Sequence, residues 1–369
     1  MKLRYKIINS IFALIAILVV SLAVVMGYTA DCDPRSAEVI EGDSMKAITY
    51  RCYGGPEVLE YGEVAKPVPA ANEVLVKVVA AGVNPLDYHY MRGTPYLLRL
   101  MGAGVGAPTQ QKMGVDFSGV VESVGQNVTQ FKVGDEVFGG KKGAFAEYLV
   151  IPEDNTIAIK PDNVTHNQAA GVAIAAVTAL QALRDLGEVQ SGDKVLINGA
   201  SGGVGTFAVQ IAKYLGAEVT GVNSARNRDM VLGIGADRVI DYKTQDYTTE
   251  SIQYDAIIDM VANHSIAKNM SVLVSDGRMV NVGAIEKGNW IGPLIKPIKS
   301  NLMNPLYDQE IKTLFASMSQ EDLNFLAQMM SEGRLTPVMD VTYPLAQASD
   351  AVAYSETGRA RGKIIITIN

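Results

Sequence analysis

Val195-Leu-Ile-Asn-Gly-Ala-Ser-Gly-Gly-Val-Gly205 is the stretch that decides the fold of this 369-residue chain. A short apolar run leads into three glycines at intervals of three, Gly199, Gly202 and Gly205, and an amphipathic run over residues 204–215 follows at once. A strand, a glycine turn and a helix in this order present free backbone N–H groups at a helix start, where a pyrophosphate can bind. The stretch therefore predicts a dinucleotide-binding unit rather than a purely structural turn. The contacts expected from it are Gly199, Ser201, Gly202, Gly203, Val204 and Gly205.

Strand-like and helix-like patterns alternate on both sides of this turn. The strand candidates are residues 194–198, 218–222, 238–240, 255–259 and 278–282. The helix candidates are residues 168–186, 204–215, 228–232 and 264–274. Repeated strand-helix-strand units predict an α/β domain with a doubly wound parallel sheet over residues 168–330.

The chain before this domain has a different pattern. Apolar runs at 46–51, 73–80, 118–124 and 136–138, separated by Gly, Pro and Asn, indicate a β-rich domain over residues 45–167. The tail, residues 331–369, is too short to fold alone and contains a helix candidate at 349–357 and a strand candidate at 364–368. We expect this tail to return to the first domain.

The end of the second strand of the α/β domain indicates which dinucleotide binds. Residues 222–228 read Val-Asn-Ser-Ala-Arg-Asn-Arg and lack the Asp or Glu that holds the ribose hydroxyls of NAD. Ser224, Arg226 and Arg228 offer a hydroxyl and two guanidinium groups, which suit a 2′-phosphate. We therefore expect NADPH. The alternative is that the two arginines merely point to solvent from a helix start.

Five further motifs resemble those of one enzyme family. They are Gly82-Val-Asn-Pro-Leu-Asp87, Gly114-Val-Asp-Phe-Ser-Gly-Val120, Val133-Gly-Asp-Glu-Val137, Gly143-Ala-Phe-Ala-Glu-Tyr148 and Gly235-Ala-Asp-Arg-Val-Ile-Asp-Tyr242. Together they make residues 45–369 similar to the quinone oxidoreductase branch of the medium-chain dehydrogenase/reductase superfamily. The resemblance implies a GroES-like catalytic domain interrupted by a Rossmann domain.

The resemblance also implies roles for single residues. Asn84 would face the nicotinamide ribose, Thr178 the nicotinamide, and Tyr242 the cofactor phosphates, while the backbone of Val282 and Gly283 would lie near the nicotinamide ring. Asp87 and Asp116 are expected to brace loops rather than to act as acids or bases. Candidates to bind a substrate carbonyl or to supply a proton are Tyr88, Tyr90 and Tyr96, with aromatic packing as the alternative for each.

The expected substrate follows from the loss of metal ligands. In the zinc-dependent branch a Cys opens the first of these motifs and a His precedes the acid of the second, whereas Asn84 and Val115 stand there in this chain. We therefore expect no catalytic zinc. Without a Lewis acid to polarise its oxygen, a conjugated electrophile such as a quinone, enone or enal is the favoured hydride acceptor. The alternatives are a non-catalytic NADPH-binding membrane-associated protein and a zinc-type alcohol dehydrogenase.

Two segments are additions to the family pattern. Residues 7–28 carry no charge and follow Lys2, Arg4 and Lys6, which predicts a helix about as long as a bilayer is thick. We expect an uncleaved membrane anchor within residues 1–30, followed by a linker at 31–44, with a cleaved signal peptide or a buried helix as alternatives. The loop at 94–112 is longer than in the family, and its glycine-rich part, residues 101–106, is predicted to be flexible.

Composition limits the remaining partners. The net charge of −7 and the lack of a Lys/Arg run argue against nucleic acid as a partner. The sequence does not decide between a monomer and a homodimer. The two cysteines, Cys32 and Cys52, are expected to be separate thiols, and a disulfide between them is the alternative that needs an oxidising compartment. The three histidines are far apart in sequence and offer no metal-ligand motif.

Overall fold

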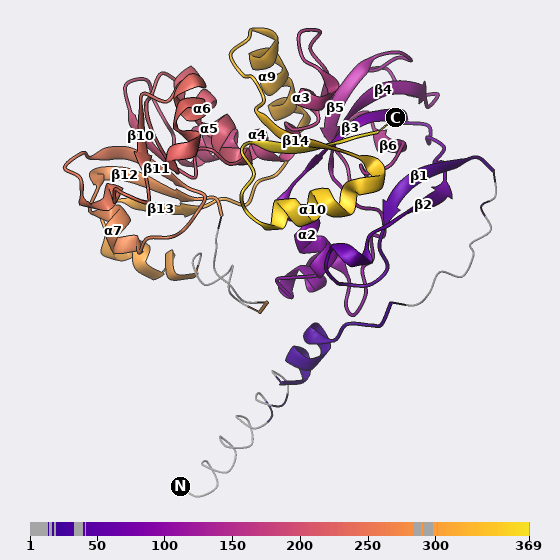
Figure 1. The fold of residues 1–369 in the computed structure, drawn as a ribbon, viewed down its shortest axis with the longest axis horizontal. Coiled ribbons are helices and arrows are strands. Elements are labelled where there is room, and N and C mark those ends of the chain that lie inside the picture. The colour runs from indigo at the N-terminus through magenta and orange to yellow at the C-terminus, as the bar shows by residue number, and fades with distance from the viewer. Residues whose placement is uncertain are drawn as a thin grey trace, which may run out of the picture.

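The computed structural model of the protein describes residues 14, 17, 20–32, 40, 42–283, 289–290, 298–300 and 302–368. Its two large sheets lie side by side, and helix α4 (Ala173–Gln181) runs between them (Figure 1). Contacts of α4 with strand β5 (Glu136–Gly140) on one side and with helix α5 (Gly203–Tyr214) on the other join the two parts of the molecule.

The first large sheet has six parallel strands in the order β10-β9-β8-β11-β12-β13. This order confirms the predicted doubly wound sheet, and the chain reverses direction across the sheet between β8 and β11, where such folds bind ligands at the carboxyl ends of the strands. The strands are β8 (Lys194–Asn198), β9 (Glu218–Asn223), β10 (Arg238–Asp241), β11 (Tyr254–Asp259), β12 (Leu273–Asn281) and β13 (Glu310–Thr313). The helical elements with them are α5, η4 (Ala225–Asn227), α6 (Arg228–Gly233), η5 (Tyr247–Thr249), α7 (Ile266–Met270) and η6 (Asn304–Leu306).

The second large sheet is the GroES-like part, with the order β14-β15-β3-β4-β5-β7 and β6 paired to β3. Strand β15 runs antiparallel to β3, so that Ile366 lies opposite Ala81, and the C-terminal tail thus adds β14 and β15 to a sheet that begins far earlier in the chain. The strands are β3 (Glu73–Val83), β4 (Asp116–Val124), β5, β6 (Tyr148–Pro152), β7 (Ile157–Ile159), β14 (Met339–Pro344) and β15 (Lys363–Thr367), with β1 (Ser44–Thr49) and β2 (Glu60–Ala65) forming a separate pair. The helical elements are η1 (Pro56–Val58), α2 (Pro85–Arg92), η2 (Arg99–Ala103), α9 (Gln320–Ser331), η7 (Leu345–Gln347) and α10 (Ala348–Glu356).

The long helix predicted over residues 168–186 is broken into three pieces. These are α3 (His166–Ala169), α4 and the π-helical turn η3 (Ala182–Leu186). At the first break, a Cβ atom on Gly171 would lie 3.2 Å from Cγ of Lys363. The break therefore lies where a long side chain from the last strand packs against the chain, a contact that helical periodicity does not reveal.

The longer loop at 94–112, whose residues 101–106 are predicted to be flexible, is partly helical in the structure. It contains the helical turn η2, in which Arg99 and Ala103 are buried. Arg99 donates hydrogen bonds to the carbonyl oxygens of Gly93 and Met26, so this loop is held to two other parts of the chain. Met101 and Val105 in its glycine-rich part are exposed, and the flexibility of residues 101–106 stays a prediction.

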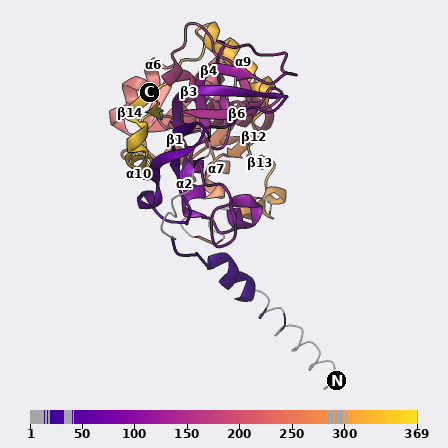
Figure 2. The same cartoon turned by 90° about the vertical axis from the view of Figure 1, so that its right-hand side faces the viewer.

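Most of the predicted anchor, residues 7–28, lies outside the described residues, and so does much of the linker at 31–44. Residues 20–27 are helical and project away from the body below α2 in both views (Figures 1 and 2). In the part of the chain that the structure describes, no helix has the length and apolar character needed to cross a membrane.

The expectation of two separate thiols was wrong, because Cys32 and Cys52 form a disulfide. The backbone N–H of Ala30 donates to the carbonyl oxygen of Gly106, which docks the segment before Cys32 on the body. This contact brings the two Cα atoms to 5.1 Å, a separation that a disulfide bond spans.

Candidate active site

The glycine turn after β8 leaves open space at the start of α5. Gly199 has a φ of +98°, and a Cβ atom on Gly205 would lie 2.1 Å from the carbonyl oxygen of Gly199, so neither position accepts a side chain. A Cβ atom on Gly202, the N-cap of α5, would have only that same oxygen within 4 Å, at 3.5 Å. The first N–H groups of α5 therefore border space in which an anion can approach them.

The start of β15 packs against this turn. The N–H of Gly362 donates to the carbonyl oxygen of Ser201 over 3.0 Å, and a Cβ atom on Gly203 would lie 3.3 Å from Cδ of Lys363. The dinucleotide turn of the parallel sheet is thus in direct contact with the GroES-like part. This contact places the candidate site at the junction of the two.

Lys363 reaches from this junction to Asn84, the N-cap of α2. Its ammonium donates to the side-chain oxygen of Asn84 and to the carbonyl oxygen of Val83, the latter over 3.2 Å. It also lies 3.5 Å from Oδ2 of Asp116, and the side chains of Lys363 and Asp116 are 3% and 0% exposed. A buried carboxylate and a buried ammonium here neutralise each other, and the Lys363 contact fixes which way the Asn84 amide points.

Two buried carboxyl groups surround Asn84. Oδ2 of Asp87 accepts the backbone N–H of Asn84 over 2.7 Å, and Oδ1 of Asp116 accepts the N–H of Ile174 over 3.1 Å. Burial raises the pKa of Asp87 to about 7. Burial also raises the pKa of Asp116, and the Lys363 ammonium opposes that rise. Both groups are occupied with holding the chain, at the starts of α2 and α4.

The end of β9 gathers polar groups beside the glycine turn. Asn227 donates from Nδ2 to the hydroxyl oxygen of Ser201 over 2.9 Å. The side-chain oxygens of Asn223 and Asn227 are buried and have no hydrogen-bond partner among the described residues. Two orphaned acceptors next to a helix start fit the ribose hydroxyls of a dinucleotide, because those hydroxyls donate hydrogen bonds.

The residues expected at a 2′-phosphate lie at the surface near these acceptors. Arg226 and Arg228 are exposed and Ser224 is half-buried. Arg226 donates one N–H to the carbonyl oxygen of Arg359 over 3.0 Å, which links the end of β9 to the tail of the chain. Tyr242 is 56% exposed, and its N–H donates to the carbonyl oxygen of Asn223. The structure therefore brings this set together around one strand end.

The residues expected near the nicotinamide lie on two elements, Thr178 in α4 and Val282 and Gly283 directly after β12. Thr178 is buried in α4 and its hydroxyl donates to the carbonyl oxygen of Ile174 over 2.6 Å. The N–H of Val282, just after β12, donates to the carbonyl oxygen of Asp259 at the end of β11. A Cβ atom on Gly283 would lie 2.7 Å from the carbonyl oxygen of Met260, so the backbone passes close there.

The three candidate tyrosines have different surroundings. Tyr88 packs against the core of the GroES-like sheet, a position that favours aromatic packing over chemistry. The ring of Tyr90 lies under the ammonium of Lys142, with 4.5 Å from Nζ to the ring centroid. Tyr96 lies in the loop after α2 and meets Trp290 edge to face at a centroid distance of 4.8 Å. Tyr90 and Tyr96 therefore stay candidates for the substrate side.

Comparison with known proteins places this geometry in a family. Residues 70–162 match the alcohol dehydrogenase GroES-like domain, and residues 234–366 match the family described as zinc-binding dehydrogenase. The quinone oxidoreductase of Sus scrofa is 34% identical, with 88% of this chain and 98% of that protein covered. The chain belongs to the medium-chain dehydrogenase/reductase superfamily. It is accordingly an NAD(P)H-dependent oxidoreductase.

Other members of this superfamily match the chain over nearly their whole length. The chloroplast envelope quinone oxidoreductase homolog of Arabidopsis thaliana is 33% identical, with 88% of this chain and 99% of that protein covered. The structure of the quinone oxidoreductase from Coxiella burnetii superposes with a TM-score of 0.78 at 31% identity, covering 89% of this chain and all of that one. The GroES-like domain and the Rossmann sheet read from the motifs are thus confirmed.

The two positions at which zinc-dependent relatives have metal ligands are occupied by Asn84 and Val115 in this chain. Asn84 and Val115 are both buried, and Oδ1 of Asn84 accepts the Lys363 ammonium. No three His, Cys, Asp or Glu side chains in the described ranges lie close enough together to hold a metal ion. The lack of a catalytic zinc stays a prediction, as do the individual site roles.

Sequence reasoning missed two residues that complete the site. Lys363 was seen only as the residue before the final apolar run, although its side chain joins the glycine turn to Asn84. Asn227, between two arginines, was not named as a candidate, although its side chain donates a hydrogen bond to Ser201 of the turn. The one signal for Lys363 was a charged residue directly before the buried run Ile364-Ile-Ile366 in the tail.

Proposed function

We propose that the protein is an NADPH-dependent, zinc-independent reductase of quinones or related conjugated enones and enals. The observation that carries this proposal is the buried contact of Lys363 with Asn84. Asn84 stands where a zinc-dependent relative has a cysteine ligand, and an ammonium bound to it opposes a divalent cation at the same place. In this proposal the positive charge beside Asn84 is therefore the Lys363 ammonium and not a zinc ion.

The preference for the 2′-phosphorylated cofactor rests on the end of β9. Ser224, Arg226 and Arg228 provide donors there, and no Asp or Glu lies among residues 222–228. The buried oxygens of Asn223 and Asn227 are acceptors that suit ribose hydroxyls. Guanidinium groups form charge-assisted hydrogen bonds to phosphate, which favours NADPH over NADH.

When bound, the nicotinamide supplies the hydride, and the residues of the chain supply position and electrostatics. Asn84, locked by Lys363, orients one of its amide N–H groups to the ribose side of the site. The N–H groups at the start of α5 bind the pyrophosphate. Tyr90 and Tyr96 flank the substrate, where a phenol can donate a hydrogen bond to the oxygen that gains charge.

The test uses the full chain with NADPH and NADH and a panel of benzoquinones, enones and simple ketones. We expect turnover of quinones or enones with NADPH preferred, inert simple ketones, and activity that survives a chelator. Stoichiometric bound zinc required for turnover would overturn zinc independence. Tight NADPH binding without turnover of any acceptor would support the non-catalytic alternative instead.

We also propose that the apolar N-terminal segment attaches the enzyme to a membrane, near lipophilic substrates. Residues 7–28 carry no charge, and the described helical residues Leu14, Ile17, Val20, Leu22, Val24 and Val25 are exposed. Sedimentation with lipid vesicles tests this for the full chain against a variant lacking residues 2–19. Equal sedimentation of the two proteins would refute the attachment.

A further inference from the structure

Arg99 is a buried cation that binds the N-terminal extension. It is 3% exposed, and no carboxylate pairs with it among the residues described. Its Nη1 donates to the carbonyl oxygens of Met26 (3.0 Å) and Tyr28 (2.6 Å), and its Nη2 donates to the hydroxyl oxygen of Thr29 (3.2 Å). The first of these carbonyls lies in the last turn of the N-terminal helix, where the helix dipole is negative. Arg99 therefore supplies the counter-charge at the end of that helix.

The same guanidinium lies over two aromatic rings of the body. Its central carbon is 4.3 Å from the ring centroid of Tyr53 and 4.6 Å from that of Tyr96. Tyr96 is held from another side by the edge-to-face contact with Trp290. Gly27 completes this junction, because a Cβ atom there would lie 3.5 Å from the Trp290 ring and 3.9 Å from the Tyr96 ring. The extension thus touches the surroundings of Tyr96 directly.

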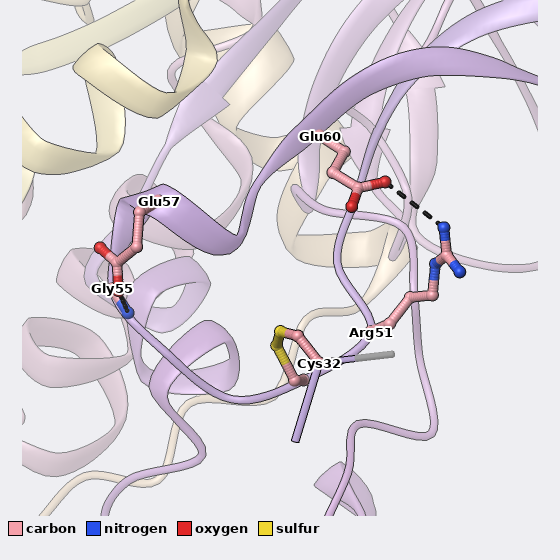
Figure 3. The surroundings of a disulfide bond; sticks show 6 residues. Cys32, Arg51, Gly55, Glu57 and Glu60 are labelled. Carbon is pink, nitrogen blue, oxygen red and sulfur yellow. Dashed lines mark hydrogen bonds and ion pairs between the residues drawn. A yellow bond between two sulfur atoms is a disulfide. The ribbon is translucent and has the colours of Figure 1, made fainter. Parts of the chain in front are cut away.

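A second tie holds the extension beyond Arg99. Ala30 donates its N–H to the carbonyl oxygen of Gly106 over 2.9 Å, and Thr29 pairs with Gly106 in a parallel β-bridge. Cys32 is bonded to the buried Cys52, beside the Arg51–Glu60 ion pair (Figure 3). Residues 26–32, here named the strap, are therefore fixed to the body at both ends.

We propose that the strap is a structural part of the substrate site and that Arg99 is a positioning residue for Tyr96. The inference rests on the proposed function in one respect, namely that Tyr96 faces the substrate. The strap has no hydrogen bond to the glycine turn, to Asn84 or to Lys363 in the described structure. Loosening it therefore disturbs substrate binding and turnover and leaves cofactor binding intact.

The side chain of Trp290 reports on this junction without any need for turnover. It is the single tryptophan of the chain, and it contacts both Tyr96 and the position of Gly27. Its fluorescence and its quenching by acrylamide therefore measure how tightly the strap and the Tyr96 loop are packed. The reporter is native to the full chain.

The experiment compares full-length Arg99→Lys and Arg99→Met with the wild type. Lysine keeps the charge but lacks the planar fork that binds three acceptors of the strap. We expect a red-shifted Trp290 emission, stronger acrylamide quenching, and kcat/KM for a benzoquinone lowered about tenfold or more, because small misplacements of a positioning group are costly. The dissociation constant for NADPH should stay within about twofold. The matched control is Arg92→Lys, which changes an exposed arginine of α2 that pairs with Glu356.

Unchanged emission and quenching in both Arg99 variants would overturn the proposal. A parallel loss of NADPH affinity would overturn the assignment to the substrate side. If the Arg99 variants fail to fold by circular dichroism, Cys32→Ser tests the strap, because Cys32 is exposed and its loss releases one end without opening the core. A wild type that turns over no acceptor contradicts the proposed function, whereas the Trp290 readout still decides whether Arg99 holds the strap.

Discussion

Replacing Lys363 by methionine removes the ammonium that neutralises Asp116 in the interior. The two groups are 3.5 Å apart, so at an effective dielectric constant of about 20 their attraction is roughly 5 kcal/mol. Without the ammonium, keeping the buried Asp116 carboxyl ionised and unpaired costs more free energy than protonating it. At pH 7 that costs about 4 kcal/mol relative to an unfolded carboxyl, which ionises near pH 4, and this is the expected loss of unfolding free energy.

The pH dependence of that loss identifies its cause. Each unit of pH changes the cost of protonating the carboxyl by about 1.4 kcal/mol, so the loss should shrink to roughly 1.5 kcal/mol at pH 5. In an Asp116→Asn background, the change of Lys363 to methionine should cost less and should not depend on pH. Urea unfolding followed by circular dichroism at the two pH values measures all four proteins. Equal losses at pH 5 and pH 7, or equal losses in the two backgrounds, would refute the reasoning.

Three other changes test different parts of the site. Gly205→Ala brings a Cβ atom to 2.1 Å from the Gly199 carbonyl oxygen, so titration should show NADPH affinity reduced about a hundredfold or more, with the rest of the fold retained. The double variant Arg226→Ala/Arg228→Ala should lower the NADPH-to-NADH ratio of kcat/KM about tenfold to a hundredfold, as expected for lost charge-assisted hydrogen bonds. An unchanged ratio would mean that both arginines point to solvent and do not bind the 2′-phosphate. Because burial raises the pKa of Asp87 to about 7, its ionisation costs stability as pH rises from about 4 to about 7, by up to about 4 kcal/mol. Asp87→Asn should remove this decline, which denaturation at several pH values would detect.

Local chemistry made much of the Rossmann part predictable. Strand β8 spans the predicted residues, because a buried apolar run that ends in a glycine turn has few other structures open to it. Helix α5 begins one residue before the predicted position, at Gly203. The glycine turn was predicted in the same way, whereas Asn84 was named only because its motif resembles one of the family.

The contacts between distant segments were not predictable from local patterns. Lys363 and Val83 are 280 residues apart, and their contact depends on the pairing of β15 with β3. Arg99 stands in an unremarkable run of residues, and its partners in the structure, Gly93 on the body and Met26 on the docked extension, are not visible in that run. Strand β13, Glu310–Thr313, is short and became recognisable only as the last parallel strand beside β12.

The pairing of β15 with β3 also sets an order of events during translation. At roughly 5 to 20 residues per second, a ribosome needs about a quarter of a minute to a minute to make the 280 residues between Val83 and Lys363. The six strands of the Rossmann sheet are complete before β15 exists, so that domain is expected to fold first. Meanwhile residues 80–83 of β3 lack a partner on the edge that β15 later covers, and such an unpaired strand edge favours aggregation of the nascent chain. Since Lys363 arrives with β15, its contacts with Val83 and Asn84 form only at the end of synthesis, after the glycine turn and the end of β9 are already in place.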